Sequence, residues 1–221
     1  MANTLIDIKN LSKTFNKVKV IKDLTVQFNA GDRIALIGQN GAGKTTLIRC
    51  ILGLYTYEGF LSVLGKNSRT ERESILQEVG FVPQLPPPLK MTVAEIMDFF
   101  AIITKTDKEK FVTIANDLKL DVKNHLNKPF LKLSGGMKQK LLVSLALARN
   151  PKILLMDEPS ANLDPEARVV LFKYLKALPQ DTLMILSSHR VDEIEDLVNR
   201  LIEMDLGEIV VDKELMPVEN I

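Results

Sequence analysis

The stretch GQNGAGKTT, residues 38–46, constrains the fold of this chain more than any other. It follows the apolar run RIALI and precedes LIRCILGL, in which Leu47, Ile51 and Leu54 have helical spacing. These neighbours predict a glycine-rich loop that joins a buried strand to the N-terminus of a helix.

The spacing within this loop suits a polyphosphate. Gly38, Gly43, Lys44 and Thr45 fit the pattern G-x-x-x-x-G-K-[ST]. Backbone N–H groups of such a loop curl around an anion, and the helix dipole adds about half a positive charge there. Lys44 would reach the β and γ phosphates, Thr45 would hold Mg²⁺ through its hydroxyl, and Thr46 would add a phosphate contact. The alternative is an ordinary turn between a strand and a helix.

Length and composition are those of an ordinary globular protein. The chain has 221 residues, 46% hydrophobic and 26% charged, which predicts one large domain or a domain with a subdomain. A formal net charge of +1 provides no overall field for nucleic acid or membrane. No apolar run reaches the ~18 residues of a membrane span, and we expect no secretory signal. Cys50, the single cysteine, is expected to be a buried thiol in a reducing cytoplasm.

The order of periodic segments predicts a parallel α/β core with a helical insertion. Alternation within the first 30 residues indicates an antiparallel β portion. The apolar runs predict strands at 152–156 and 182–187 and a helix from about 165 to 178, with Asp164 as its N-cap.

Three consecutive prolines at residues 86–88 exclude a helix or a central strand there, so we predict a subdomain boundary. A capping box of Thr92 and Glu95 begins a helical region. The prediction is a single domain over residues 1–221. Residues 1–88 and 151–221 form its β subdomain and core, and residues 89–150 form its helical subdomain.

Two carboxylates end the apolar run ILLMDEP. The carboxyl ends of strands are where α/β folds bind ligands. Asp157 would bind Mg²⁺ directly or through water, and Glu158 is the best candidate for the general base that activates a water. The alternative is a solvated acidic pair.

A second anion site is indicated by LSGGMKQK, residues 133–140. Ser134 is a plausible N-cap of the following helix, and Gly135 and Gly136 would expose backbone N–H groups. Taken alone, the segment is equally well explained as a cap and a turn.

Together these stretches resemble the ATP-binding subunits of ATP-binding-cassette (ABC) transporters over nearly the whole chain. GQNGAGKTT is similar to the Walker A loop, FVPQ to the glutamine loop, LSGGM to the signature, ILLMDE to Walker B, SANLD to the D-loop and SSH to the histidine switch. The resemblance implies a P-loop NTPase core of the RecA-like type, with ATP and Mg²⁺ as cofactors and ATP hydrolysis as the activity.

The resemblance also implies roles for single residues. Gln84 would contact Mg²⁺ or the attacking water, and His189 would contact the γ phosphate and steady Glu158. Phe15 would stack on adenine, although a role in the β-subdomain core is nearly as well supported. Asp164 would serve both the subunit interface and its helix cap. The remaining residues of the phosphate loop complete the binding set: Gln39, Asn40, Gly41 and Ala42.

The resemblance further implies a head-to-tail dimer, either of two copies or with a second ABC subunit. Each ATP would be held by the phosphate loop of one subunit and by Ser134, Gly135 and Gly136 of the other. Separate transmembrane permease subunits would bind near Leu85 to Met91, where the prolines shape a groove or merely end a strand. The subunit would then be cytoplasmic, on the inner face of the cell membrane.

Met137, in place of the frequent glutamine, and the absence of an appended regulatory domain favour an exporter. The alternative function is an ABC-class ATPase that acts on DNA or ribosomes. No basic patch supports this alternative, and we expect no nucleic-acid partner.

Overall fold

The computed structural model describes residues 3–188 and 191–215, which belong to two compact units. The first unit comprises Met1–Val79, Lys152–Asp157 and Pro179–Ile221, and the second comprises Gly80–Pro151 and Glu158–Leu178. The chain therefore leaves the first unit twice and returns to it twice. The predicted helical segment, 89–150, lies within the second unit.

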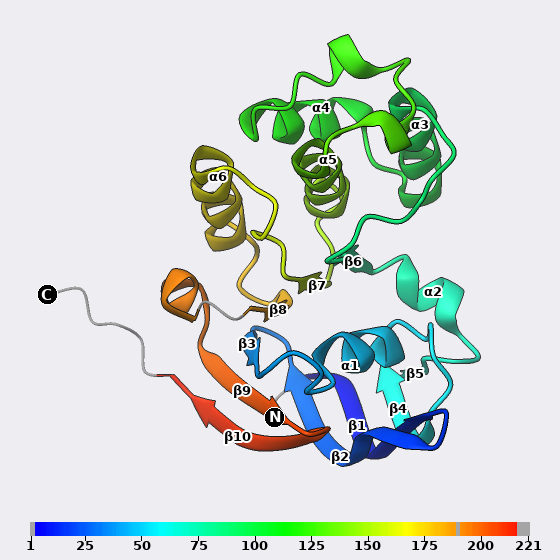
Figure 1. The fold of residues 1–221 in the computed structure, drawn as a ribbon, viewed down its shortest axis with the longest axis vertical. Helices are drawn as coiled ribbons and strands as arrows, with labels where there is room; N and C mark the ends of the chain where they lie inside the picture. Colours follow the sequence, from blue (N-terminus) through cyan, green and yellow to red (C-terminus); the bar gives the residue numbers. More distant parts are fainter. Residues whose placement is uncertain (1–2, 189–190, 216–221) are drawn as a thin grey trace, which may run out of the picture. The chain divides into compact units, whose positions relative to one another are not determined.

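Among its described residues, the first unit contains two sheets and two α-helices (Figure 1). Its elements, in chain order, are β1 (Thr4–Phe15), β2 (Val18–Asn29), β3 (Arg33–Ile37), α1 (Lys44–Ile51), β4 (Glu58–Val63), β5 (Lys66–Asn67), α2 (Arg72–Leu76), β7 (Ile153–Asp157), β8 (Leu183–Ser187), short 3-10 turns at Val191–Glu193 and Glu195–Leu197, β9 (Arg200–Asp205) and β10 (Glu208–Glu214). Strand β6 (Val79–Val82) begins at the last residue of this unit's first segment.

The pairing of these strands confirms the predicted α/β class. One sheet is antiparallel, with the order β2-β1-β4-β5. In the other sheet, the strands of this unit follow the order β10-β9-β3-β8-β7. Strand β3 pairs in parallel with β8 and β9, and β7 pairs in parallel with β8, whereas β10 pairs with β9 in the antiparallel sense. The core sheet is therefore mainly parallel, as predicted.

Burial explains why the central strands form. Every residue of β7 and of β8 is buried, which is the pattern of a parallel strand covered on both faces. Strand β1 instead alternates, with Ile6 and Ile8 fully buried between more exposed neighbours. Because β3 and β7 are both parallel to β8, the polar residues that follow β3 and β7 lie at the same carboxyl edge of the core sheet.

The second unit is helical apart from β6. Its elements are α3 (Val93–Thr104), α4 (Lys108–Asp117), 3-10 turns at Lys123–His125 and Phe130–Lys132, α5 (Gly135–Leu147) and α6 (Pro165–Lys176). The predicted capping box at the start of α3 is confirmed: Glu95 N donates to Thr92 Oγ1, and Thr92 N donates to Glu95 Oε2 at 2.7 Å. On the apolar side of α3, Val93 and Ile96 are buried, whereas Phe99 remains 49% exposed.

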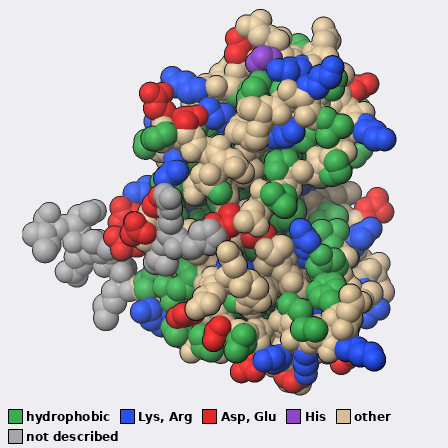
Figure 2. Space-filling model, viewed as in Figure 1, with side chains coloured by type: hydrophobic (Ala, Val, Ile, Leu, Met, Phe, Trp, Pro, Cys, Tyr) green, Lys and Arg blue, Asp and Glu red, His purple; other side chains and the backbone are tan. Residues whose placement is uncertain are grey.

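None of the helices within residues 3–188 and 191–215 has the length and apolar character needed to cross a membrane. Basic and acidic side chains are interspersed on the face shown in Figure 2.

Candidate functional site

The phosphate-type loop connects β3 to α1 and depends on glycine at two positions. Gly43 has φ 107° and is the N-cap of α1, and Gly38 has φ 141°. A Cβ on Gly38 would lie 2.1 Å from the carbonyl oxygen of Met204. Backbone conformations of this kind are readily adopted only by glycine. The conformation of the loop therefore depends on glycine, and helix α1 begins at Lys44, directly after Gly43.

The Lys44 side chain folds back onto this loop. Its ammonium group donates to the carbonyl oxygens of Gly38 at 2.6 Å and Gln39 at 3.1 Å, and the residue is 7% exposed. Three predicted site residues thus meet at one point. A buried ammonium beside a helix N-terminus concentrates positive charge, which suits a polyphosphate.

The other loop residues differ in exposure. Ala42 is buried and packs the loop against the unit, while Thr45 and Thr46 are half-buried at the start of α1. Three residues at the tip are exposed: Gln39, Asn40 and Gly41. The loop therefore presents its middle to solvent and its ends to the core.

Asp157 ends β7 and is 3% exposed. Its Oδ2 accepts a hydrogen bond from the Thr45 hydroxyl at 2.7 Å, and its Oδ1 accepts one from the Ser187 hydroxyl at 2.5 Å. Hydroxyl and carboxylate oxygens are hard donors of the kind that Mg²⁺ prefers, and Mg²⁺ is usually bound by one or two protein groups together with water and phosphate. Thr45 and Asp157 therefore fit such an ion, which would supply charge neutralisation at the phosphates.

The sequence predictions gave no role to Ser187. It ends β8, which pairs in parallel with β7 so that Asp157 and Ser187 are register partners. In the sequence, the segment SSH predicts a role only for its histidine. Knowledge that β7 and β8 are neighbours would have predicted that the serine lies beside Asp157. The sequence does not show which strands are neighbours.

Glu158 follows Asp157 directly and belongs to the second unit. It is 7% exposed and has φ 51°, in the left-handed region that a residue with a side chain seldom adopts. Its carbonyl oxygen accepts a hydrogen bond from Ala161 N at 3.2 Å. A strained backbone at a buried carboxylate is typical of functional sites and supports a chemical role for this residue.

The signature residues begin α5 in the second unit. Ser134 is its N-cap, and its hydroxyl oxygen accepts a hydrogen bond from Met137 N at 3.2 Å. A Cβ on Gly135 would meet nothing within 4 Å, so the helix tip is open on that side. This geometry agrees with a cap and also leaves backbone N–H groups accessible to an anion.

Asp164 is the N-cap of α6, with Pro165 as the first helical residue. Its Oδ1 accepts from Ala167 N at 2.9 Å, which confirms the predicted cap. Its Oδ2 lies 2.6 Å from the Lys140 ammonium. The hydrogen bond from Lys140 and that from Ala167 N lower the pKa of this carboxyl. Lys140 was not among the predicted site residues.

Three other predicted site residues have different surroundings. Gln84 is exposed and follows β6 in the second unit. His189 lies outside the described residues. Phe15 ends β1 and is 37% exposed, with its ring at 5.1 Å from that of Tyr55 and the Lys13 ammonium 4.5 Å from its centroid.

Phe15 is connected to the phosphate-type loop through the β1–β2 hairpin. It pairs with Val18, and a Cβ on Gly43 would lie 3.1 Å from the carbonyl oxygen of nearby Val20. An exposed ring at this place is available for stacking.

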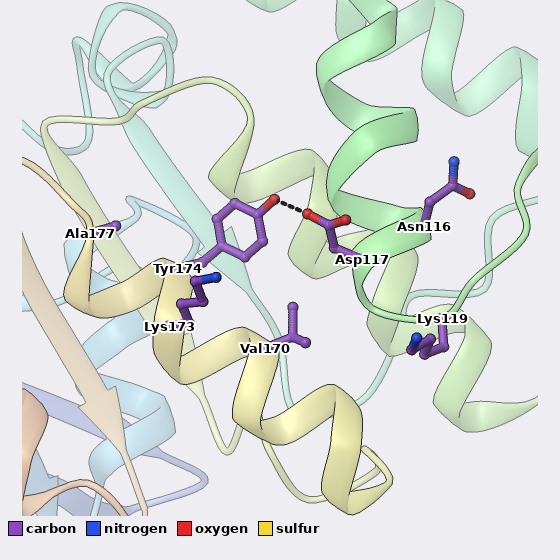
Figure 3. Close-up of a pocket in the computed structure, with 7 residues that line it drawn as sticks. All are labelled: Asn116, Asp117, Lys119, Val170, Lys173, Tyr174 and Ala177. Carbon is purple, nitrogen blue, oxygen red and sulfur yellow. Dashed lines mark hydrogen bonds between the residues drawn. The ribbon is translucent and has the colours of Figure 1, made fainter.

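A cavity of about 500 Å³ lies between the end of α4 and one face of α6 in the second unit (Figure 3). The Tyr174 hydroxyl points across it and donates to Asp117 Oδ2 at 2.5 Å. None of the predicted site residues lines it. Its lining comprises Asn116, Asp117, Lys119, Val170, Lys173, Tyr174 and Ala177.

Residues 21–161 match the family model described as ABC transporter. The phosphonates import ATP-binding protein PhnC 2 of Oceanobacillus iheyensis is 32% identical, with 95% of this chain and 90% of that protein aligned. The Nod factor export ATP-binding protein I of Rhizobium etli is 33% identical over 94% of this chain and 67% of that protein. The methionine import ATP-binding protein MetN of Clostridium acetobutylicum is 32% identical over 98% of this chain and 70% of that protein.

Solved structures agree. One described as the ATP binding subunit of an ABC transporter has a TM-score of 0.85 at 26% identity and covers 96% of this chain and 90% of its own. The ATP-binding cassette MJ0796 shares the fold with a TM-score of 0.83 at 22% identity, over 95% of this chain and 98% of its own. That structure is a dimer in a post-hydrolysis state with ADP and Pi. A glycine loop with a buried lysine, an aspartate at the end of the neighbouring strand, a matching family and matching folds lead to one conclusion: this chain belongs to the ABC transporter family, as an ATP-binding subunit.

Proposed function

We propose that this subunit binds MgATP at residues 38–46 and hydrolyses it in a head-to-tail dimer that powers a transporter. The observation that carries the proposal is the cluster of Lys44, Thr45 and Asp157 at a helix N-terminus, in which the buried residues Lys44 and Asp157 lie beside the half-buried Thr45. Lys44 would bind the β and γ phosphates. Thr45 and Asp157 would hold Mg²⁺, with Gln84 as a further ligand.

Hydrolysis needs a base, and Glu158 is the residue we assign to it. Its burial and its left-handed backbone support a positioned carboxylate. His189 would contact the γ phosphate and orient Glu158. Phe15 would stack on the adenine ring.

The second half of each site would come from the partner. Ser134, Gly135 and Gly136 would bind the γ phosphate held by the facing subunit, and Asp164 would lie at the interface. The open tip of α5 at Gly135 supports this assignment. Because only ATP has a γ phosphate, ATP would favour the closed dimer and hydrolysis would reopen it.

The membrane partner would be a separate set of permease subunits that contact Leu85 to Met91. Leu85 is 76% exposed and is therefore accessible to such a partner. The subunit would accordingly be cytoplasmic and peripheral on the inner face of the membrane. The names of the relatives above include both import and export proteins, so our proposal of export rests on the sequence features given for it, chiefly Met137. Their names all refer to transport, which favours this function over action on DNA or ribosomes.

The test is the Glu158→Gln variant. Its molecular mass is measured by analytical ultracentrifugation with MgATP and with MgADP, and its turnover by phosphate release. We expect a dimer with MgATP only, and turnover reduced by about a thousandfold. Glu73→Gln removes an exposed carboxylate from α2 and should leave both properties unchanged. A variant that stays monomeric in MgATP, or that turns over normally, would contradict the proposal.

The transporter partnership has its own experiment. The tagged subunit is purified from solubilised membranes, and copurifying proteins are identified by mass spectrometry. A multi-span protein is the expected partner. Recovery with ribosomes or DNA instead would favour the alternative class.

A further inference from the structure

The segment Pro159–Asp164, which joins Glu158 to α6, is held against the first turns of α5. The Lys140 ammonium on α5 lies 2.6 Å from Asp164 Oδ2. The Lys140 side chain is only 10% exposed, whereas that of Asp164 is 48% exposed. A nearly buried ammonium is costly without a partner, so separating the two would leave Lys140 with an uncompensated charge.

One further hydrogen bond and one close approach of the backbone lie along the same segment. The Gln139 side chain, which is fully buried, donates through Nε2 to the carbonyl oxygen of Pro159 at 3.3 Å. At Gly136, a Cβ would lie 3.0 Å from the carbonyl oxygen of Asn162. The segment is therefore bonded to α5 at its beginning and at its end, and its backbone passes close to Gly136 near its middle.

The Asp164 carboxylate connects two helices. One oxygen caps α6 through Ala167 N, and the other pairs with Lys140 on α5. The start of α6 and the start of α5 are thereby fixed to each other through a single side chain. Both helix starts carry residues that we assign to the dimer interface, Ser134 to Gly136 on one and Asp164 on the other.

We propose that Lys140 is a positioning residue that holds the signature residues, Ser134 to Gly136, in a fixed position relative to the segment 159–164. Both groups of residues would then reach the partner subunit's ATP together when the dimer closes. This inference rests on the proposed function. It predicts that loss of the Lys140 charge weakens ATP-driven closure but does not affect ATP binding to the separate subunit, because that binding uses the phosphate loop of the first unit.

The experiment is carried out in the Glu158→Gln background. The dimer dissociation constant in MgATP is measured by analytical ultracentrifugation, and MgATP affinity is measured at protein concentrations where the subunit is monomeric. Lys140→Met retains the apolar stem but not the charge, and should weaken the dimer about fivefold, in the range of couplings between contacting residues. Lys140→Arg retains the charge and should restore dimerisation to within about twofold. MgATP affinity of the monomer should be the same in all variants.

Lys108→Met is the matched control. It removes a lysine of the same unit whose ion pair with Asp98 is exposed on both sides, and dimerisation should not change. The thermal unfolding temperature of each variant shows whether a weaker dimer results from a less stable fold or from impaired dimer closure alone. Asp164→Asn provides a second approach, because asparagine still caps α6 while the ion pair is lost.

The outcomes are distinguishable. In a double-mutant cycle, Lys140→Met and Asp164→Asn together should weaken the dimer no more than either alone. Additive effects, or a Lys140→Met dimer as stable as its parent, would overturn the positioning role and leave the proposed function intact. A Glu158→Gln parent that does not dimerise would overturn the proposed function and this inference with it.

Discussion

The Thr45 hydroxyl donates a hydrogen bond to Asp157 Oδ2 at 2.7 Å, although the two residues are 112 positions apart in the chain. The bond joins the first turn of α1 to the end of β7. It places a hydroxyl and a carboxylate at the same point, where a metal ion beside a polyphosphate would be bound. The following predictions concern residues around this point and the structure that supports it.

Ser187→Ala should impair metal use more than folding. The change removes the hydroxyl that donates to Asp157 Oδ1, and a buried acceptor left without its donor costs about 1–3 kcal/mol. We expect the carboxylate to lose its fixed orientation, so that turnover needs about tenfold more Mg²⁺. The measurement is phosphate release as a function of Mg²⁺ concentration. Ser144→Ala, at a buried hydroxyl that only bonds back to Lys140 O in its own helix, is the control.

Phe15→Ala should show whether Phe15 stacks on the adenine ring or serves in the core of the β subdomain. Loss of an aromatic stack on a base costs about 1–3 kcal/mol, so MgATP affinity should fall about tenfold or more. Binding of inorganic triphosphate, which has no base, should be unchanged. Calorimetric titration with both ligands checks this. Phe60→Ala removes another exposed ring that lies under a lysine, and should affect neither ligand. Equal losses for ATP and triphosphate, together with lower thermal stability, would favour the core role.

Gly38→Ala should disrupt the loop by a direct clash. The added Cβ would lie 2.1 Å from the Met204 carbonyl oxygen in a backbone conformation that disfavours alanine. We expect a loss of about 3 kcal/mol in the free energy of unfolding, measured by urea denaturation. At Gly65, which also has positive φ but has open space for a Cβ, alanine should cost only ~1 kcal/mol. Similar losses at both sites would show that the close approach at Gly38 is unimportant.

Tyr174→Phe should remove a pH-dependent contribution to stability. Burial, the hydrogen bond to Asp117 and the charge of that carboxylate raise the pKa of Tyr174 to about 12. The folded-state pKa lies above the unfolded value of about 10, so the contribution is complete below pH 10 and is lost as the pH rises towards 12. At pH 8 the variant should be less stable by about 1 kcal/mol.

Urea denaturation at pH 8, 9.5 and 11 measures this difference, which should shrink as the pH rises. Asp117→Asn retains an oxygen that accepts the hydrogen bond but removes the negative charge. Its pH dependence should therefore lie between those of the wild type and Tyr174→Phe. A difference that stays constant over this range would contradict the raised pKa.

Local patterns predicted much of the fold. The capping box at Thr92, the cap and proline at Asp164, and the apolar strand that ends at Asp157 each arise within a few residues, and each is present as predicted. The glycine loop was predictable for the same reason, because its geometry is imposed by its own residues.

Pairs that form only on folding were not predictable. Ser187 with Asp157, Lys140 with Asp164, and Tyr174 with Asp117 join different elements, and none has a spacing that marks it in the sequence. A lysine or tyrosine on a helix is usually solvated, so its type alone does not indicate a partner. The assigned roles of Gln84 and His189 stay predictions.

Under the proposed function, the left-handed backbone of Glu158 (φ 51°) would lower stability at the residue assigned to hydrolysis. Glycine at this position would relieve about 1 kcal/mol of conformational strain, but it would also remove the only group assigned to proton abstraction. Selection for heat resistance alone should therefore enrich glycine here and yield robust proteins that no longer cleave nucleotide. Any laboratory evolution of this subunit would have to screen for activity alongside robustness.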